Sequence, residues 1–345
     1  MRRGLMAWDA KEVPVATIEA RQQKLREAMA RDGLDAFIAY TNIARPAAVS
    51  WMSGFTPYWS EGVYCLPARG TPVFATALSK RVAEWIGTVM AVGEVVPTPA
   101  PGAAIGKQLA EWGVNKAGIL ELDDLPAKQA TALMQNAPQV EFSDATALFA
   151  PARAQVDDAE RALVNIAAQL ARECMDLVDS EAGNAQDIIA AVEKHARLAG
   201  AEEIFISIAP DLTLGAQLKR TDTAQELGEA FALRISLAYK AGWVRLARSF
   251  ARSGRGATDF DRLQQMFDTF APTKGASIHG MLTQIFADNG ATLKNWTLEQ
   301  PRGGYPLAIV AGRDVENAWS PQGPSVLSVE VETSGGSWLA AKPLA

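Results

Sequence analysis

Apolar residues recur with two different periods along the first 150 positions. Residues 18–34 place Leu25, Ala28 and Met29 at helical spacing between charged residues, and Gly33 follows as a stop signal. Short apolar runs bounded by glycine and proline predict strands, and longer amphipathic stretches predict helices. The predicted strands are residues 35–40, 49–55, 62–67, 72–76, 94–97 and 117–121, and the further helices are residues 79–88 and 105–112. Strands that alternate with helices predict a helix-covered sheet, so this part is expected to be an α/β domain.

The pattern changes around residues 149–156, a proline-marked stretch that precedes a long predicted helix over residues 157–178. Helices are then predicted at residues 185–199, 260–270 and 278–289, and strands at residues 203–209, 230–239, 243–251, 307–311 and 326–333. Grouped helices and grouped strands predict an α+β arrangement. We therefore divide the chain into residues 1–152 and 153–345.

Composition narrows the classes of function. The chain has 345 residues, is 48% hydrophobic and carries a formal charge of -6, so it offers no basic face of the kind that binds nucleic acid. No apolar run is long enough for a membrane span or a signal peptide, which favours a cytoplasmic protein without membrane partners. The motifs of P-loop, zinc-peptidase and serine-hydrolase sites are absent from the sequence. Gly102 and Gly106 resemble a dinucleotide fingerprint only faintly, because proline precedes them where a strand should.

Several landmarks occur in the order found in the creatinase, prolidase and aminopeptidase P family. They are Trp51–Phe55, Gly118–Pro126, Arg153 with Glu160, Gly242 with Trp243, and Arg248–Phe250. The chain resembles this family over some 300 residues. The resemblance implies an N-terminal creatinase-like α/β domain, a C-terminal α+β pita-bread domain, and a homodimer formed through the N-terminal domain.

The resemblance also implies two divalent metal ions, and the residues that should bind them are missing. Residues 230–258 contain no aspartate or glutamate, although the family places two aspartate ligands there. The first would fall among Arg234, Ile235 and Ser236, and the second near Arg245 or Leu246. Hard divalent ions need anionic oxygen ligands. We expect no metal and no other cofactor.

The remaining ligand positions are equally altered. Tyr305 stands where the resemblance expects a histidine, and Glu330 or Glu332 matches the first of two glutamates. The second would fall at residues 339–342, which contain no acid. His279 follows Ser277, a good N-cap, and matches no family ligand position, which leaves surface placement or a general-base role open.

The hairpin has instead become cationic. Arg245 and Arg248 lie on a strand that alternation predicts to be half buried, where an unpaired guanidinium is costly. Two interpretations are compatible: an internal ion pair with Glu330 or Glu332, or a fork that grips a carboxylate or phosphate. The candidate ligand-binding residues are Arg234, Arg245, Arg248, Lys219, Tyr239 and Trp243.

Two hypotheses of function follow. The first is a metal-independent pseudoenzyme whose cleft binds a small anionic or peptide-like ligand, or supports a hetero-partner. The second is a metal-independent hydrolase of C–N bonds, related to creatinase-like amidinohydrolases or Xaa-Pro peptidases. Its catalytic residues would be Tyr305, Glu330, Glu332 and His279. The creatinase reaction itself needs a histidine within residues 215–222, where Lys219 and Arg220 stand instead.

Overall fold

The chain forms two compact units, which we describe one at a time. The computed structural model describes residues 8–56, 60–154, 156–221, 223–252, 255–273, 275–302, 305–313 and 324–344. The N-terminal unit ends at Glu160, and the C-terminal unit begins at Arg161, apart from the short stretch Arg302–Tyr305, which belongs to the first. The sequence pattern places the boundary eight residues earlier, between residues 152 and 153.

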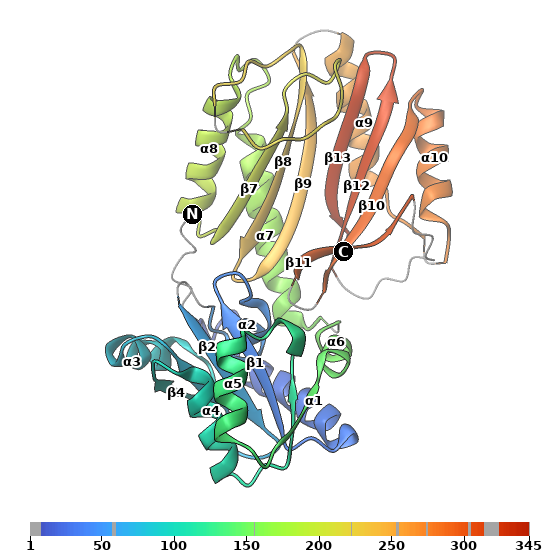
Figure 1. The fold of residues 1–345 in the computed structure, drawn as a ribbon. Coiled ribbons are helices and arrows are strands. Elements are labelled where there is room, and N and C mark those ends of the chain that lie inside the picture. Colours follow the sequence, from blue (N-terminus) through green and yellow to red (C-terminus); the bar gives the residue numbers. More distant parts are fainter. Residues whose placement is uncertain are drawn as a thin grey trace. The chain divides into compact units, whose positions relative to one another are not determined.

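The described part of the N-terminal unit contains a six-stranded mixed sheet with the order β4-β3-β2-β1-β5-β6 (Figure 1). Its strands are β1 (Ala36–Asn42), β2 (Glu61–Pro67), β3 (Val73–Thr76), β4 (Glu94–Pro97), β5 (Lys116–Ile119) and β6 (Glu141–Asp144). Its α-helices are α1 (Val15–Asp32), α2 (Ala47–Ser53), α3 (Lys80–Val89), α4 (Pro101–Glu111), α5 (Ala127–Asn136) and α6 (Thr146–Ala154). One buried cluster packs α1, α2, α3 and α6 on one face, and a second packs α4 and α5 on the other. The predicted α/β domain is confirmed.

One predicted strand of this unit is wrong. Residues 49–55 were expected to be extended, but helix α2 spans Ala47–Ser53. A short apolar run fits a strand or a buried helix equally well by periodicity. The hydroxyls of Ser50 and Ser53 donate to backbone carbonyls four residues earlier, and Gly54 ends the helix in the left-handed conformation with φ 75°. The period of so short an apolar run does not distinguish the two, whereas Gly54 is a residue that commonly ends a helix.

The spaced glycines of α4 have a packing role. A Cβ on Gly102 would lie 2.4 Å from the carbonyl oxygen of Gln129, and one on Gly106 would lie 2.5 Å from that of Leu133. Both carbonyls belong to α5. The two glycines therefore let the helix backbones approach closely, which accounts for the motif without a nucleotide.

A buried polar cluster fixes the start of α7 (Asp158–Asp176) within the N-terminal unit. Arg21 donates to both carboxylate oxygens of Asp157, at 2.6 and 3.0 Å, and to the carbonyl of Trp51. Arg153 pairs with Glu160 at 2.8 Å, and the indole of Trp51 donates to Glu160. The Arg153 and Glu160 landmark of the sequence is thus an ion pair that joins α6 to α7.

The C-terminal unit contains, in its described part, a seven-stranded sheet with the order β11-β10-β12-β13-β9-β8-β7. The strands are β7 (Glu203–Ala209), β8 (Ala230–Tyr239), β9 (Gly242–Ala251), β10 (Thr292–Arg302), β11 (Tyr305–Gly312), β12 (Ser325–Thr333) and β13 (Gly336–Leu344). The helices are α7, α8 (Ala185–Leu198), α9 (Arg255–Thr269) and α10 (Ile278–Asp288). The α+β domain is confirmed, although β10 and β13 were not predicted from the sequence. No helix in the described ranges is long and apolar enough to cross a membrane.

The strands of this sheet have two chemically different faces. Leu233 and Ile235 of β8 and Val244 and Leu246 of β9 pack in one buried cluster with α7 and α8. We call this side the helix face. Because side chains alternate along a strand, the residues between them point the other way. We call that side, which carries Arg234 and Arg245, the pocket face.

We expect Gly106→Ala to destabilise the protein by about 1–3 kcal/mol, because the added methyl group overpacks the contact between α4 and α5. Gly87→Ala is the matched control, since Gly87 lies exposed on α3 with no atom within 4 Å of an added Cβ. That change should stabilise the protein by up to about 1 kcal/mol. Urea denaturation measures both, and equal effects would refute the packing role.

A second prediction concerns acid stability. Burial alone would raise the pKa of Asp157, but hydrogen bonds and the charge of Arg21 outweigh it and hold that pKa below its usual range. The resulting stability is fully present above the unfolded pKa of about 3.9 and is lost as pH falls through the folded value. Asp157→Asn should therefore lower the free energy of unfolding by about 2–3 kcal/mol near neutral pH. It should also weaken the decrease of that free energy as the pH falls to 3. Asp158→Asn, at an exposed neighbouring position, is the control and should leave this pH dependence unchanged. Urea titrations between pH 3 and 7 measure it for each variant.

Candidate functional site

The hairpin of β8 and β9 directs two arginines to the pocket face. Arg245 lies opposite Ser236, and Ser236 in turn lies opposite Phe205 of β7. One row further along the sheet, Arg234 lies opposite Ser207. Strand alternation and register thus place these five side chains beside one another.

These residues line a pocket of 220 Å³ within the C-terminal unit. The lining is Phe205, Ser207, Arg220, Arg234, Ser236, Trp243 and Arg245. Pockets for drug-sized ligands usually measure about 300–1,000 Å³, so this one fits only a small molecule. Ser207 and Ser236 are buried, and the three arginines are the charged groups of the lining.

Arg245 is held on both sides by hydrogen bonds. Its Nε donates to the hydroxyl of Ser236 at 2.9 Å, and its Nη1 contacts both carboxylate oxygens of Glu299. The Glu299 side chain is 9% exposed and that of Arg245 is 22% exposed. Glu299 belongs to β10, which β12 and β13 separate from β9, so the pair connects the two halves of the sheet.

Arg234 has no such neutralising contact. Burial lowers the pKa of its guanidinium, and the charge of Arg245 lowers it further, whereas Glu299 acts in the opposite direction and Arg220 again disfavours the charge. Neither the guanidinium of Arg234 nor the hydroxyl of Ser207 forms a hydrogen bond to another residue in the described part of the chain. Their side-chain donors therefore have no protein partner in the described part of the chain.

Aromatic rings complete the wall. The rings of Phe205 and Trp243 stack with centroids 5.8 Å apart and an angle of 8°. The guanidinium of Arg220 lies 4.4 Å from the centre of the Phe205 ring, a close cation–π contact. Arg220 follows Lys219, whose backbone exchanges two hydrogen bonds with Ile208 of β7. The loop that carries Arg220 is thereby attached to the edge of the sheet.

The metal ions implied by the fold do not fit these residues. Ile235 and Leu246 lie buried on the helix face, so the hairpin presents Arg234, Ser236 and Arg245 at the expected ligand positions. Guanidinium groups carry positive charge and accept no metal, and one serine hydroxyl is a weak substitute for two carboxylates. Among the described residues, no group of three or more His, Cys, Asp or Glu is placed to hold a metal ion.

The other predicted ligand-binding residues lie away from this pocket. Arg248 lies opposite Leu233, a helix-face residue, and its guanidinium lies 5.5 Å from the centre of the Phe250 ring. Tyr239 packs against the buried cluster beneath α7 and α8. Lys219 is exposed beside the pocket residue Arg220. Trp243, Arg234 and Arg245 are the predicted ligand-binding residues that the structure brings together.

The predicted catalytic residues are not gathered around the pocket. Glu332 pairs with Lys294, and Glu330 lies on β12, separated from β8 by β13 and β9. The proposed pairing of Arg245 with Glu330 or Glu332 is wrong, because Glu299 takes that place. His279 is exposed, and its Nδ1 accepts from the indole of Trp296. The side chain of Tyr305 falls outside the described residues.

Sequence reasoning missed Glu299 and four pocket residues, which are Phe205, Ser207, Arg220 and Ser236. Phe205 and Ser207 could have been found, because they alternate with Ile204, Ile206 and Ile208 in a correctly predicted strand. Glu299 was hidden because a bulge between Leu293 and Asn295 breaks the period of β10. Arg220 carried no usable signal, since a loop closure places it.

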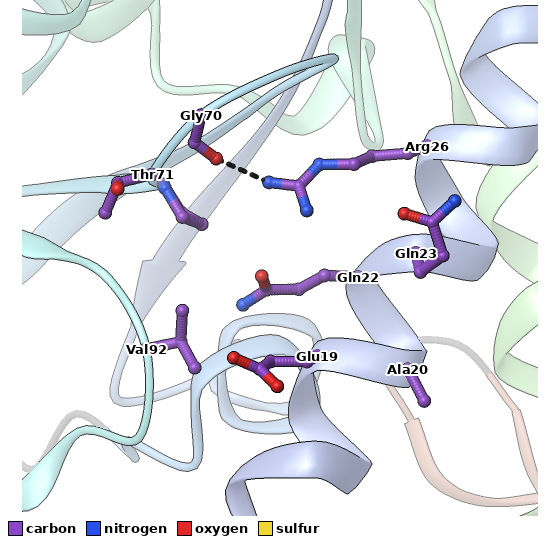
Figure 2. Close-up of a pocket in the computed structure, with 9 residues that line it drawn as sticks. Glu19, Ala20, Gln22, Gln23, Arg26, Gly70, Thr71 and Val92 are labelled. Atoms are coloured by element: carbon purple, nitrogen blue, oxygen red, sulfur yellow. Dashed lines mark hydrogen bonds between the residues drawn. The ribbon is translucent and has the colours of Figure 1, made fainter.

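A larger hollow of 470 Å³ in the N-terminal unit has a structural explanation. Figure 2 shows Glu19, Gln22, Gln23 and Arg26 along α1, facing the turn at Gly70 and Thr71. Arg26 donates to the carbonyls of Pro67 and Gly70, which ties this turn to α1. Gln22 donates to the carbonyl of Met52 and the hydroxyl of Tyr64. These polar groups are used in holding the unit together.

Comparisons with known proteins agree with this geometry. Residues 21–155 match the family model of the creatinase/prolidase N-terminal domain. The Xaa-Pro dipeptidase from Bacillus anthracis is similar over 94% of each chain, with 15% identity and a TM-score of 0.63. The X-Pro aminopeptidase from Thermotoga maritima covers 92% of this chain and 94% of its own, with 14% identity and a TM-score of 0.67. The comparison with curated proteins gives no match.

The chain is therefore a two-domain α/β protein with the prolidase fold. Its N-terminal domain is similar to the creatinase/prolidase N-terminal domain. The resemblance to creatinase, prolidase and aminopeptidase P is confirmed, and the solved structures show that the fold extends through the C-terminal domain.

Removing the carboxylate of Glu299 should destabilise the C-terminal unit. Glu299→Gln leaves the Arg245 guanidinium without its counter-charge, and we expect a loss of about 2–3 kcal/mol in urea denaturation. Glu332→Gln is the control, because that carboxylate is 55% exposed and its pairing with Lys294 should contribute less than about 1 kcal/mol. Equal losses in the two variants would contradict the role of the pair.

Proposed function

We propose that this protein is a metal-independent member of its fold class whose pocket binds a small anionic ligand. The observation that carries the proposal is the environment of Arg234. Its partly buried guanidinium lines the pocket together with Arg245 and Arg220 and has no carboxylate partner of its own among the described residues. Arg234 and Arg245 are partly buried and Arg220 is exposed beside them. Cations close to one another repel, and a bound anion removes that repulsion. Anion binding is therefore the activity that the electrostatics of the pocket favour.

The donors of the pocket suit such a ligand. Guanidinium groups present a planar fork of N–H donors that matches carboxylate and phosphate oxygens. The free hydroxyl of Ser207 adds another donor on the opposite strand. A cationic substrate would meet like charge on the same walls.

Peptide hydrolysis has less support. The similar structures are named as prolidases, Xaa-Pro dipeptidases and aminopeptidases, but the positions that would hold their metal ions carry arginine in this chain. A metal-independent C–N hydrolase would need His279 and the two glutamates near the ligand, and these lie apart from the pocket. Assembly as a homodimer, a hetero-partner and a cytoplasmic location stay predictions of the resemblance.

Thermal unfolding in the presence of small molecules tests the proposal. The anions to test are sodium salts of small carboxylates, phosphate and sulfate. Neutral amides and cationic guanidinium compounds serve as comparisons, and all solutions have the same ionic strength. An anion at about 100 times its dissociation constant should stabilise the wild-type protein by about 2.7 kcal/mol. Arg234→Gln should abolish this shift.

Arg172→Gln serves as the charge-matched control. Arg172 is exposed on α7, and its substitution changes the net charge by the same amount as Arg234→Gln. It should retain the shift. No stabilisation by any anion, or near-stoichiometric manganese, cobalt or zinc in protein purified without chelator, would refute the proposal.

A further inference from the structure

We infer that the pocket selects a compact dianion, a ligand with two negative charges within a few ångströms of each other. This inference rests on the proposed anion-binding function and specifies the class of ligand. It comes from the balance of charges around the pocket and from its small volume.

The described charges around the pocket leave two arginines without a counter-ion. Arg220, Arg234 and Arg245 contribute three positive charges to the lining. Glu299 contacts Arg245 with both carboxylate oxygens, which neutralises one of them. Within the described residues, no carboxylate pairs with Arg220 or Arg234. The remaining two positive charges match a ligand of charge -2.

The other acids of the pocket face do not line the pocket. Glu330 lies on β12, with β13 and β9 between it and β8. Glu330 is not among the residues that line the pocket, and no ion pair joins it to Arg220 or Arg234 among the described residues. Glu332 is exposed and pairs with Lys294. Neither acid replaces an anion between Arg220 and Arg234.

The two unpaired arginines reach the same pocket from different elements. Arg234 rises from the centre of the hairpin, whereas Arg220 comes from the loop bound to β7 through the paired backbones of Lys219 and Ile208. The stack of Arg220 on Phe205 holds its guanidinium over the sheet. A ligand between them can accept hydrogen bonds from two forks at once, which a single negative charge satisfies less completely.

The size of the pocket limits the ligand further. A volume of 220 Å³ suits a tetrahedral oxyanion of the phosphate or sulfate type, or a short dicarboxylate. Both share the chemistry of a dianion with several acceptor oxygens. Ser207 and Ser236, which lie on neighbouring strands, and Trp243 also line the pocket.

Isothermal titration calorimetry with matched pairs of anions tests the inference on the wild-type protein. The pairs are sulfate and methyl sulfate, methyl phosphate and dimethyl phosphate, and succinate and its monoamide, all at constant ionic strength. The dianion of at least one pair should bind about 10 to 100 times more tightly, since one more charged hydrogen-bonding group contributes this much. The pair with the largest ratio distinguishes an oxyanion from a dicarboxylate.

Two further measurements report on charge alone. The affinity for methyl phosphate should rise as the pH increases through about 6, where its second proton dissociates, whereas that for sulfate should stay constant. Arg220→Gln should reduce the preference for the dianion to a few-fold while monoanions still bind. Arg172→Gln should leave the preference unchanged.

The outcomes separate this inference from the proposed function. Equal binding of monoanions and dianions would overturn the inference and leave anion binding intact. Absence of binding by every anion would overturn both. A dianion preference that Arg220→Gln does not change would also overturn the inference, because the second charge would then be recognised elsewhere.

Discussion

The ion pair between Arg245 and Glu299 is the interaction on which the pocket face depends. It brings a carboxylate of β10 to an arginine of β9 across the sheet, and it orients the Ser236 hydroxyl beside the pocket. Without Glu299, three guanidinium groups would face one small hollow with no negative charge among them. With it, one arginine becomes part of the structure and the others remain available to a ligand.

This arrangement differs from the dimetal site that the family resemblance implies. The N-terminal domain packs as its family model implies, with helices on both faces of a mixed sheet and the Arg21 and Asp157 pair at the start of α7. The C-terminal sheet has the same overall fold as those of the prolidases and the X-Pro aminopeptidase. Its hairpin presents arginines on the pocket face. Fold and chemistry are thus separable, as is common when sites differ on a shared scaffold.

Periodicity predicted most elements because most of them bury one face. Strands β7, β8 and β9 were found within one residue of their limits, since each alternates cleanly against α7 and α8. The failures have local causes. The segment at Ala47–Ser53 is too short and too apolar for its period to be read, and the bulge in β10 shifts its alternation after Leu293.

The sequence by itself determined that the hairpin has no acid and carries several arginines. That Arg234 and Arg245 share one face depends on the register between β8 and β9, which the structure shows. Only the tertiary structure decided which acid pairs with Arg245 and that Arg220 joins the pocket. Glu299 is 54 residues from Arg245 in the chain, and Arg220 reaches the site through a loop. Local periodicity contains no information on such contacts, which depend on strand order and loop closure.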